Sequence, residues 1–155
     1  MSSEKILELI VPDAVCLQLD AKNSTEVIQC LGGRLKEAGC VKDSFVEAAL
    51  SRESKLPTGL PLGAAYNAAI PHTDVEHVIK PALAVATLKN PVPFKNMIDP
   101  DDDVQVNLVI LMALDQPKAQ VEMLQEIATV LQDSATIEGL VQASSIEEVM
   151  TSLKA

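Results

Sequence analysis

The run VQVNLVILMAL at residues 104–114 limits the folds open to this chain more than any other feature. Apolar and polar residues alternate at its start, as in a strand with one solvent-facing side, and the run then becomes apolar on both sides. A strand of that kind lies at the centre of a sheet whose two faces are both covered. We therefore expect an α/β domain (α+β in some schemes) that is a three-layer α/β/α sandwich with a mixed central β-sheet.

Shorter patterns predict the other strands and helices. Apolar stretches at 15–19, 67–70 and 82–88 predict three further strands. Helical periodicity and capping residues predict helices from Asn23–Thr25 to Gly39, from Asp43 or Ser44 to the residue before Leu56, from Pro117 onward, and over 136–143 and 145–153. Val121 lies on the predicted inward stripe of the helix that begins at Pro117. The 155 residues suffice for one domain, 1–155, with its own core.

The charge and hydropathy of the chain exclude several classes of protein. The net charge is -10, and no basic stretch is present, so the surface would repel a nucleic acid. The same charge suits a basic protein partner or simple solubility equally well. No apolar run approaches the roughly 20 residues of a membrane span, and the N-terminus lacks the pattern of a secretory signal. We expect a cytoplasmic, free-standing subunit that does not insert into a membrane.

No residue pattern predicts a metal or cofactor site. The three cysteines, Cys16, Cys30 and Cys40, form no CxxC motif and are expected to be small buried hydrophobic residues. The two histidines, His72 and His77, are five residues apart, and the chain has no third histidine to complete a metal site.

His72 follows an apolar stretch of small residues that ends at Pro71, in the sequence NAAIPHTD. Proline ends strand pairing, so this imidazole is expected at a strand end, where sites of sheet proteins gather. It could act as a general base, a metal ligand or a nucleophile. A catalytic triad is not expected, because the chain has no G-x-S-x-G elbow. A histidine that acts alone is typical of phosphoryl carriers, and an ordinary structural histidine remains the alternative.

The stretch REsklPTGlplGaayNAAIPH, residues 52–72, resembles the enzyme IIA domain of the mannitol/fructose/galactitol class of the bacterial phosphoenolpyruvate-dependent sugar phosphotransferase system. The resemblance extends over nearly the whole chain and includes the later VxLVIxxA strand and the helix after it. It implies a mannitol-type enzyme IIA-like fold and a phosphotransferase component with a phosphohistidine intermediate.

The resemblance also implies partners and roles. His72 matches the histidine that accepts a phosphoryl group from the phosphocarrier protein HPr and passes it to a cysteine of enzyme IIB. The resemblance implies that the domain associates with the membrane permease IIC only through enzyme IIB. Arg52 matches the arginine that offsets the phosphate charge. Thr58 and Gly59 match the P-T-G turn of the phosphate site, and Thr73 stands where it could crowd or hydrogen-bond the phosphate.

Many members carry a second histidine at the start of the late helix, and Gln120 takes that position here. A neutral amide donates a hydrogen bond but cannot become cationic. This replacement, with LPTG and DQPKAQ, resembles the galactitol branch most closely. Arg52 also continues the helical stripe of Phe45 and Ala49, which points it where the apolar face points.

Each residue also has an ordinary interpretation. Arg52 suits a helix C-terminus, Thr58 a turn, and Gln120 a surface. His77 is expected to be structural or solvated, and the carboxylates of Asp74 and Glu76 only to solvate the segment. The competing functions are a regulatory phosphohistidine module of the nitrogen-phosphotransferase kind, without onward transfer to IIB, and a purely structural relative; the intact RE…PTG…IPH block argues against the latter.

Overall fold

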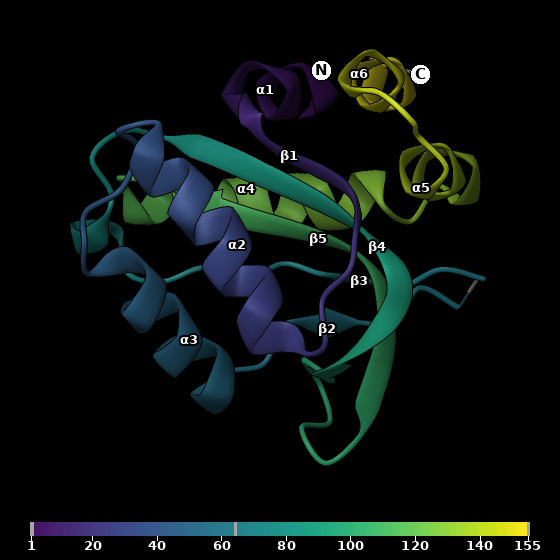
Figure 1. The fold of residues 1–155 in the computed structure, drawn as a ribbon, viewed down its shortest axis with the longest axis horizontal. Helices are drawn as coiled ribbons and strands as arrows, with labels where there is room; N and C mark the ends of the chain where they lie inside the picture. The colour runs from purple at the N-terminus through teal and green to yellow at the C-terminus, as the bar shows by residue number, and fades with distance from the viewer. Residues whose placement is uncertain (1, 64, 155) are drawn as a thin grey trace.

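The computed structural model describes residues 2–63 and 65–154, which form a five-stranded mixed sheet with helices on both faces (Figure 1). The strands are β1 (Ile10–Leu19), β2 (Gly59–Leu60), β3 (Ala68–Ala69), β4 (Ala82–Lys95) and β5 (Asp103–Ala113). Their order is β1-β4-β5-β3-β2. The pairs β1–β4 and β3–β5 are parallel, and β4–β5 and β2–β3 are antiparallel. The expected three-layer sandwich with a mixed sheet is confirmed.

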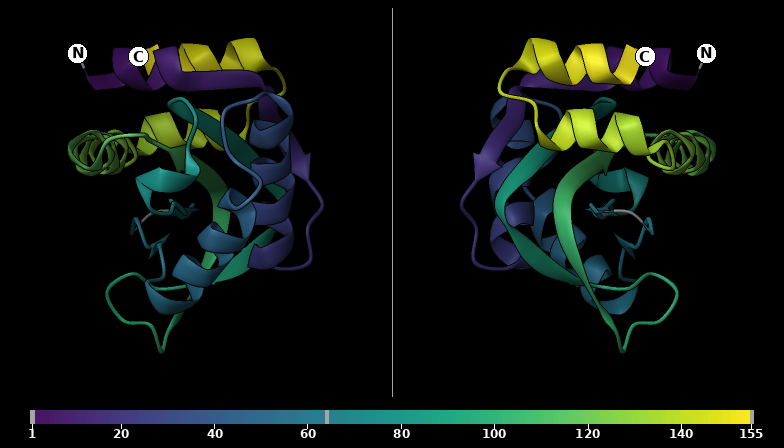
Figure 2. Two further views of the ribbon diagram at one scale, coloured as in Figure 1. Left: turned by 90° about the vertical axis from the view of Figure 1, so that its left-hand side faces the viewer. Right: turned by 90° about the vertical axis from the view of Figure 1, so that its right-hand side faces the viewer.

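Two groups of helices form the outer layers. The helices are α1 (Ser2–Leu9), α2 (Ser24–Glu37), α3 (Phe45–Lys55), α4 (Pro117–Val130), α5 (Ser134–Val141) and α6 (Ile146–Lys154), with a short 3-10 helix η1 (Val75–His77). Helices α2 and α3 cover one face, and the other four α-helices lie on the opposite side, as the edge-on views in Figure 2 show. Each face of the sheet therefore has its own apolar core.

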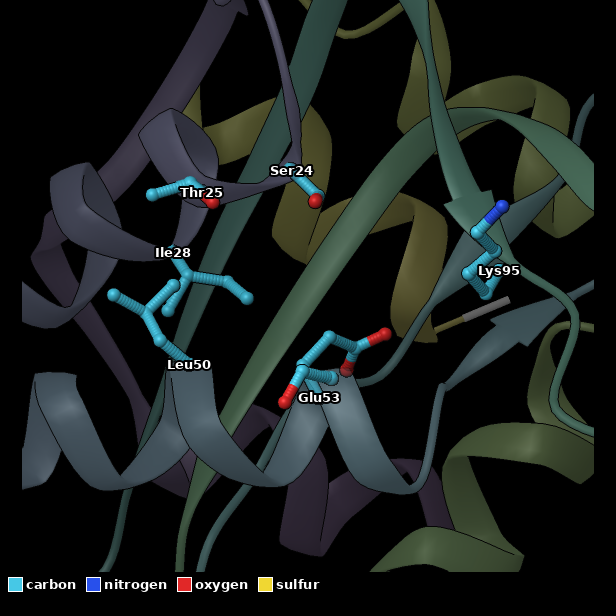
Figure 3. Close-up of a pocket in the computed structure, with 7 residues that line it drawn as sticks. Ser24, Thr25, Ile28, Leu50, Glu53 and Lys95 are labelled. Carbon is cyan, nitrogen blue, oxygen red and sulfur yellow. The ribbon is translucent and has the colours of Figure 1, made fainter. Parts of the chain in front are cut away.

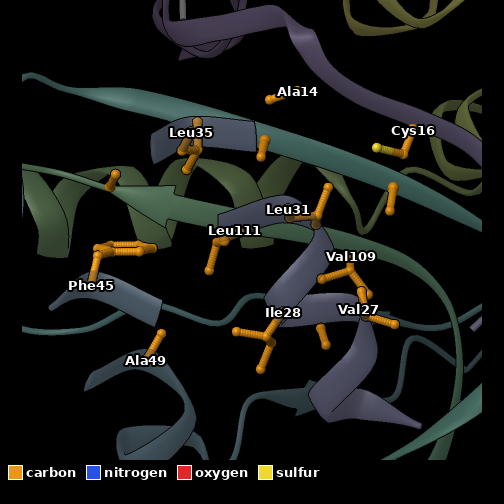
Figure 4. Packing of buried hydrophobic residues seen from close by; sticks show 14 of the residues in the cluster. Ala14, Cys16, Val27, Ile28, Leu31, Leu35, Phe45, Ala49, Val109 and Leu111 are labelled. Atoms are coloured by element: carbon orange, nitrogen blue, oxygen red, sulfur yellow. The ribbon is translucent and has the colours of Figure 1, made fainter. Parts of the chain in front are cut away.

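Strand β5 contributes to both cores, as its sequence predicts. Val109 and Leu111 face α2 and α3, where they pack with Leu31 and Phe45 (Figure 4). Ile110, between them, faces the opposite core. All five side chains are 2% exposed or less. Complete burial on both faces makes β5 the strand around which the two layers of helices assemble.

Three of the predicted helix boundaries rest on identifiable residues at the helix ends. The Asn23 side chain accepts a hydrogen bond from the backbone N–H of Glu26 (2.9 Å), as an N-cap residue does. Gly39 follows the end of α2 with a φ of +78°, a conformation that glycine adopts without strain. Pro117 lies in the first turn of α4, where its missing N–H costs no hydrogen bond.

The sequence analysis missed α1, β2 and η1, and it made β1 and β4 too short. Strand β1 begins five residues earlier than expected, and β4 continues past Leu88 to Lys95 despite Pro91 and Pro93. The pairing with β1 ends at Leu88, so beyond it one edge of β4 has no neighbouring strand and a proline there removes no ladder bond. A shift of register between Thr87 and Val92 in the pairing with β5 also hides the alternation of apolar residues.

Two predictions about burial were partly wrong. Val121 was placed on the inward stripe of its helix but is 56% exposed. Cys16 and Cys40 are buried, whereas Cys30 is only half-buried. The Sγ atoms of Cys16 and Cys30 lie 4.0 Å apart, and burial raises the pKa of the Cys16 thiol to about 11, so this thiol stays protonated.

None of the described helices is long and apolar enough to cross a bilayer. The described residues also contain no group of three or more histidine, cysteine, aspartate or glutamate side chains placed to hold a metal ion.

Candidate active site

His72 lies where the chain leaves β3, at the carboxyl end of two parallel neighbours. Ala69 of β3 pairs with Val109 of β5, and the carbonyl of Pro71 then accepts a hydrogen bond from the backbone N–H of Met112 (3.0 Å). The short segment after β3 thus continues beside β5 and ends on the imidazole. This edge of the sheet, on the left in Figure 1, is where β5 gives way to α4. The structure therefore places His72 at a strand end, as Pro71 predicts.

The imidazole of His72 is held by one of its two nitrogens. Nδ1 lies 3.0 Å from the carbonyl oxygen of Ile70, and because a carbonyl only accepts, Nδ1 carries the proton of the neutral ring. No described residue forms a hydrogen bond with Nε2. The ring is largely buried, with an exposed fraction of 9%. His72 therefore presents an unprotonated nitrogen with a free lone pair.

The surroundings keep this imidazole neutral. Burial lowers the pKa of His72 below its ordinary value of 6.5, since the charged form loses solvation. The hydrogen bond to Ile70 opposes this shift, the positive charge of Arg52 lowers the pKa further, and the negative charge of Asp74 raises it. At neutral pH the ring is a nucleophile rather than a cation.

Arg52 reaches the site from the last turn of α3. Its Nη1 lies 3.2 Å from Oδ1 of Asp74, two residues after His72. Its Nε is buried and has no hydrogen-bond partner among the described residues. Arg52, Thr73 and Asp74 line one open pocket together with Ala48, Ser51, Lys55, Leu56 and His77. A guanidinium with an unused donor is suited to bind an anion, and the charge of Arg52 acts on the imidazole of His72.

The P-T-G turn is fixed by Glu53, the residue after Arg52. The carboxylate of Glu53 accepts hydrogen bonds from the backbone N–H of Thr58 (2.9 Å) and from its hydroxyl (2.8 Å). Gly59 lies against the backbone carbonyl of Lys95, with which a Cβ atom would clash. Strand β2, which begins at Gly59, pairs with β3, and β3 ends at Ala69, shortly before His72. Thr58 and Gly59 thus support the strand that carries the histidine.

Glu53 also lines a pocket between the start of α2 and the end of α3 (Figure 3). Lys95 lines the same pocket, but its Nζ pairs with Asp103 (3.0 Å). Burial raises the pKa of Glu53 from 4.5 to about 7, against the two bonds from Thr58, which lower it. The turn is therefore attached to a carboxyl group that titrates near neutrality.

Gln120 contacts the other side of the segment that follows His72. Its Nε2 donates a hydrogen bond to the carbonyl of Thr73 (2.6 Å). Thr73 itself is buried, with 4% of its surface exposed. Gln120 belongs to the first turn of α4, so the helix that follows β5 holds the segment that follows β3.

His77 has a separate, structural contact. Its Nδ1 lies 2.7 Å from Oγ of Ser44, and its carbonyl accepts a hydrogen bond from the backbone N–H of Lys42 (2.9 Å). The residue joins η1 to the loop before α3, in agreement with the expectation of a structural histidine.

The structure brings together the predicted residues His72, Arg52, Thr73 and Gln120, with Thr58 and Gly59 in support. Among the described residues, neither Thr58 nor Gln120 makes a hydrogen bond to the imidazole. Sequence reasoning missed two roles. Asp74 was expected only to be solvated, and it forms an ion pair with Arg52. Glu53 was noticed only as part of an Arg-Glu pair. The position of Glu53, five residues before Thr58, is the one signal in the sequence for its contact with the turn.

Comparison with known proteins then decides the family. The family model described as "Phosphoenolpyruvate-dependent sugar phosphotransferase system, EIIA 2" matches residues 8–155. The chain belongs to this family. The resemblance inferred from the RE…PTG…IPH block is confirmed.

Individual EIIA relatives show the range of the family. The galactitol-specific EIIA component of Escherichia coli K12 is 32% identical over 117 residues, 76% of this chain and 77% of that protein. The fructose-specific EIIABC component of Bacillus subtilis is 29% identical over 150 residues, 94% of this chain but 22% of that longer protein. The chain is also similar to a chain in the solved complex of mannitol enzyme IIA with phosphorylated enzyme IIB from E. coli, with a TM-score of 0.76 and 28% identity. The similarity covers 94% of this chain and 96% of that chain.

Proposed function

We propose that this EIIA domain accepts a phosphoryl group from phosphorylated HPr on Nε2 of His72 and passes it to a cysteine of a galactitol-type enzyme IIB during sugar uptake. The observation that carries the proposal is the imidazole itself. Its Nδ1–H is bound to Ile70, and its Nε2 is left without a protein partner among the described residues. The galactitol assignment is supported by the 32% identity to the galactitol-specific component and by the glutamine at position 120.

The transfer requires little from the protein beyond position and charge. The lone pair of Nε2 attacks phosphorus in line, the nitrogen–phosphorus bond forms, and the bond from phosphorus to the donor breaks. The proton on Nδ1 stays in its hydrogen bond with Ile70, which stabilises the positive charge that the ring acquires. The unused Nε–H of Arg52 is a donor for a phosphoryl oxygen. Onward transfer repeats the displacement with the thiolate of IIB as the nucleophile.

The surface around the site supports a protein partner. Leu56, in the same pocket as Arg52, is 57% exposed, and Val121, next to Gln120, is 56% exposed. Exposed large apolar side chains beside a site that must meet two other proteins are suited to contacts at an interface. The mannitol enzyme IIA of E. coli, which is 28% identical, forms a complex with its phosphorylated enzyme IIB.

Labelling with radioactive phosphoenolpyruvate, enzyme I and HPr tests the proposal. We expect wild-type protein to acquire one acid-labile phosphate, His72→Gln to acquire none, and the control His77→Gln to be labelled like wild type. Galactitol-type IIB added to the labelled protein should take up the phosphate.

Two results would contradict the proposal. The first is label on His72→Gln, or no label on wild type in a mixture that phosphorylates another EIIA. The second is a labelled His72 whose phosphate does not move to galactitol-type, mannitol-type or fructose-type IIB, which would instead indicate the regulatory module.

A further inference from the structure

One donor group of Arg52 is engaged by an acidic side chain, and another is unused. Its Nη1 is engaged by Asp74 at 3.2 Å, while its Nε is buried and unpartnered among the described residues. In the proposed function the phosphoryl group arrives beside the same guanidinium. The positive charge of Arg52 acts on His72, so the carboxylate of Asp74 and the phosphoryl group would both be attracted to this one charge.

Asp74 is placed to be a mobile partner of Arg52 rather than part of the core. Its side chain is 68% exposed, against 35% for Arg52. Among the described residues its carboxylate has no other hydrogen bond or ion pair, and its backbone carbonyl starts η1 by accepting from the N–H of His77 (3.3 Å). The carboxylate can therefore leave the guanidinium without breaking another contact of its own.

Asp74 is also close enough to His72 to act on a charge there. Its carboxylate and the charge of Arg52 have opposite effects on the imidazole, which shows that both fields reach the ring. A phosphoryl group on Nε2 brings negative charge into the same field. Asp74 then repels that group directly and weakens the hold of Arg52 on it.

We propose that Asp74 is a positioning residue that holds Arg52 while His72 is unmodified and competes with the phosphoryl group for Arg52 afterwards. The inference rests on the proposed function. Asp74 destabilises the phosphorylated form relative to the free form, so that phosphate leaves His72 readily for the next acceptor. No bond to Asp74 is made or broken in the transfer.

The size of the effect follows from the exposure of the pair. Exposed ion pairs are weak because water and salt screen them, so removal of the carboxylate should shift the transfer equilibrium by about two- to fivefold. Asp74→Asn keeps the shape of the side chain and removes its charge. Glu76→Gln removes one charge from the same segment, at an exposed residue without a contact to Arg52, and is the matched control.

The first experiment measures the equilibrium between phosphorylated HPr and each variant. We expect Asp74→Asn to hold two- to fivefold more phosphate at equilibrium and to release it to IIB more slowly. Glu76→Gln should equal wild type, and Asp74→Glu, which restores the charge, should return most of the way to wild type. An unchanged or opposite shift in Asp74→Asn, or an equal shift in Glu76→Gln, would overturn the inference.

A second experiment does not depend on phosphoryl transfer. The N–H signal of Arg52 Nε is followed by NMR while inorganic phosphate is added. Asp74→Asn should bind phosphate about two- to fivefold more tightly than wild type and Glu76→Gln. If wild type is never labelled, the proposed function is wrong, but this titration still tests whether Asp74 competes with phosphate for Arg52. If wild type is labelled but Asp74→Asn behaves as wild type in both experiments, only the proposed competition is wrong.

Discussion

The Nδ1 atom of His72 lies 3.0 Å from the carbonyl oxygen of Ile70, two residues earlier in the chain. This contact between the side chain and the backbone of the segment that follows β3 fixes the tautomer of the ring and points Nε2 away from that carbonyl. The carbonyl of the intervening Pro71 is in turn held by Met112 of β5. The reactive nitrogen is therefore positioned by the central sheet rather than by a flexible loop.

The tautomer of His72 gives the first prediction. Nitrogen NMR at about pH 7.5 should show a neutral ring protonated on Nδ1, because a carbonyl accepts that proton. Acidification should protonate the ring only below 6.5, since burial lowers the pKa of His72. The rate of labelling should stay constant between about pH 7 and 8 and fall at lower pH. A ring protonated on Nε2, or a pKa above 6.5, would contradict the assignment of the nucleophile.

The two adjacent glycines of α2 give a second prediction, on stability. A Cβ on Gly33 would meet no atom within 4 Å, so Gly33→Ala should stabilise the protein by about 0.5–1 kcal/mol through helix propensity. A Cβ on Gly32 would lie 2.6 Å from Cγ2 of Val46 on α3, so Gly32→Ala should lose that gain or destabilise the fold. Urea denaturation of both variants measures the difference, and equal effects would refute the close packing of α2 on α3.

Much of the fold follows from local sequence. The double-sided burial of β5 is visible as an apolar run, and the caps at Asn23 and Pro117 are chemical signals within one helical turn. The end of β4 is not visible in this way, because its register shift breaks the alternation and its prolines are tolerated only where β1 no longer pairs. Whether a proline removes a hydrogen bond depends on a neighbouring strand that local sequence does not show.

The positions of the candidate site residues follow only in part from local sequence. Pro71 locates His72 at a strand end, and helical spacing directs Arg52 toward the apolar face. The ion pair between Arg52 and Asp74 joins residues 22 positions apart, so only the folded chain brings them together. The Glu53 contact spans five residues and was within reach of the sequence, but Glu53 was interpreted only as part of the Arg-Glu pair in the RE…PTG…IPH block.

Gln120 gives a third prediction, on the reaction rate. Its bond to the carbonyl of Thr73 holds the residue next to His72, and loss of one such bond costs about 0.5–1.5 kcal/mol. Gln120→Ala should slow labelling by HPr about two- to tenfold and lower the free energy of unfolding by about 1 kcal/mol. Gln125→Ala, an exposed amide on the same helix, is the control and should change neither. A wild-type labelling rate in Gln120→Ala would show that Gln120 does not help to position His72.

Glu53 gives the last prediction, on pH and stability. Burial raises the pKa of its carboxyl from 4.5 to about 7, so the folded protein binds a proton that the unfolded chain releases near 4.5. The stabilisation is fully present below 4.5 and is lost as the pH rises through about 7. We expect this group to lower the free energy of unfolding by about 2 kcal/mol between pH 5 and 8, less than the roughly 3 kcal/mol of a full shift.

Glu53→Gln isolates that contribution. The amide oxygen can still accept from the N–H of Thr58, and the amide nitrogen can donate to its hydroxyl, so the turn keeps its attachment. Urea denaturation at each pH, compared with wild type, should show the variant losing about 2 kcal/mol less between pH 5 and 8. Glu47→Gln, an exposed carboxylate on the same helix, should keep the wild-type dependence. If the free energy of unfolding depends on pH identically in all three proteins, ionisation of Glu53 does not destabilise the folded state. The P-T-G turn would then be held by a charged carboxylate throughout this pH range.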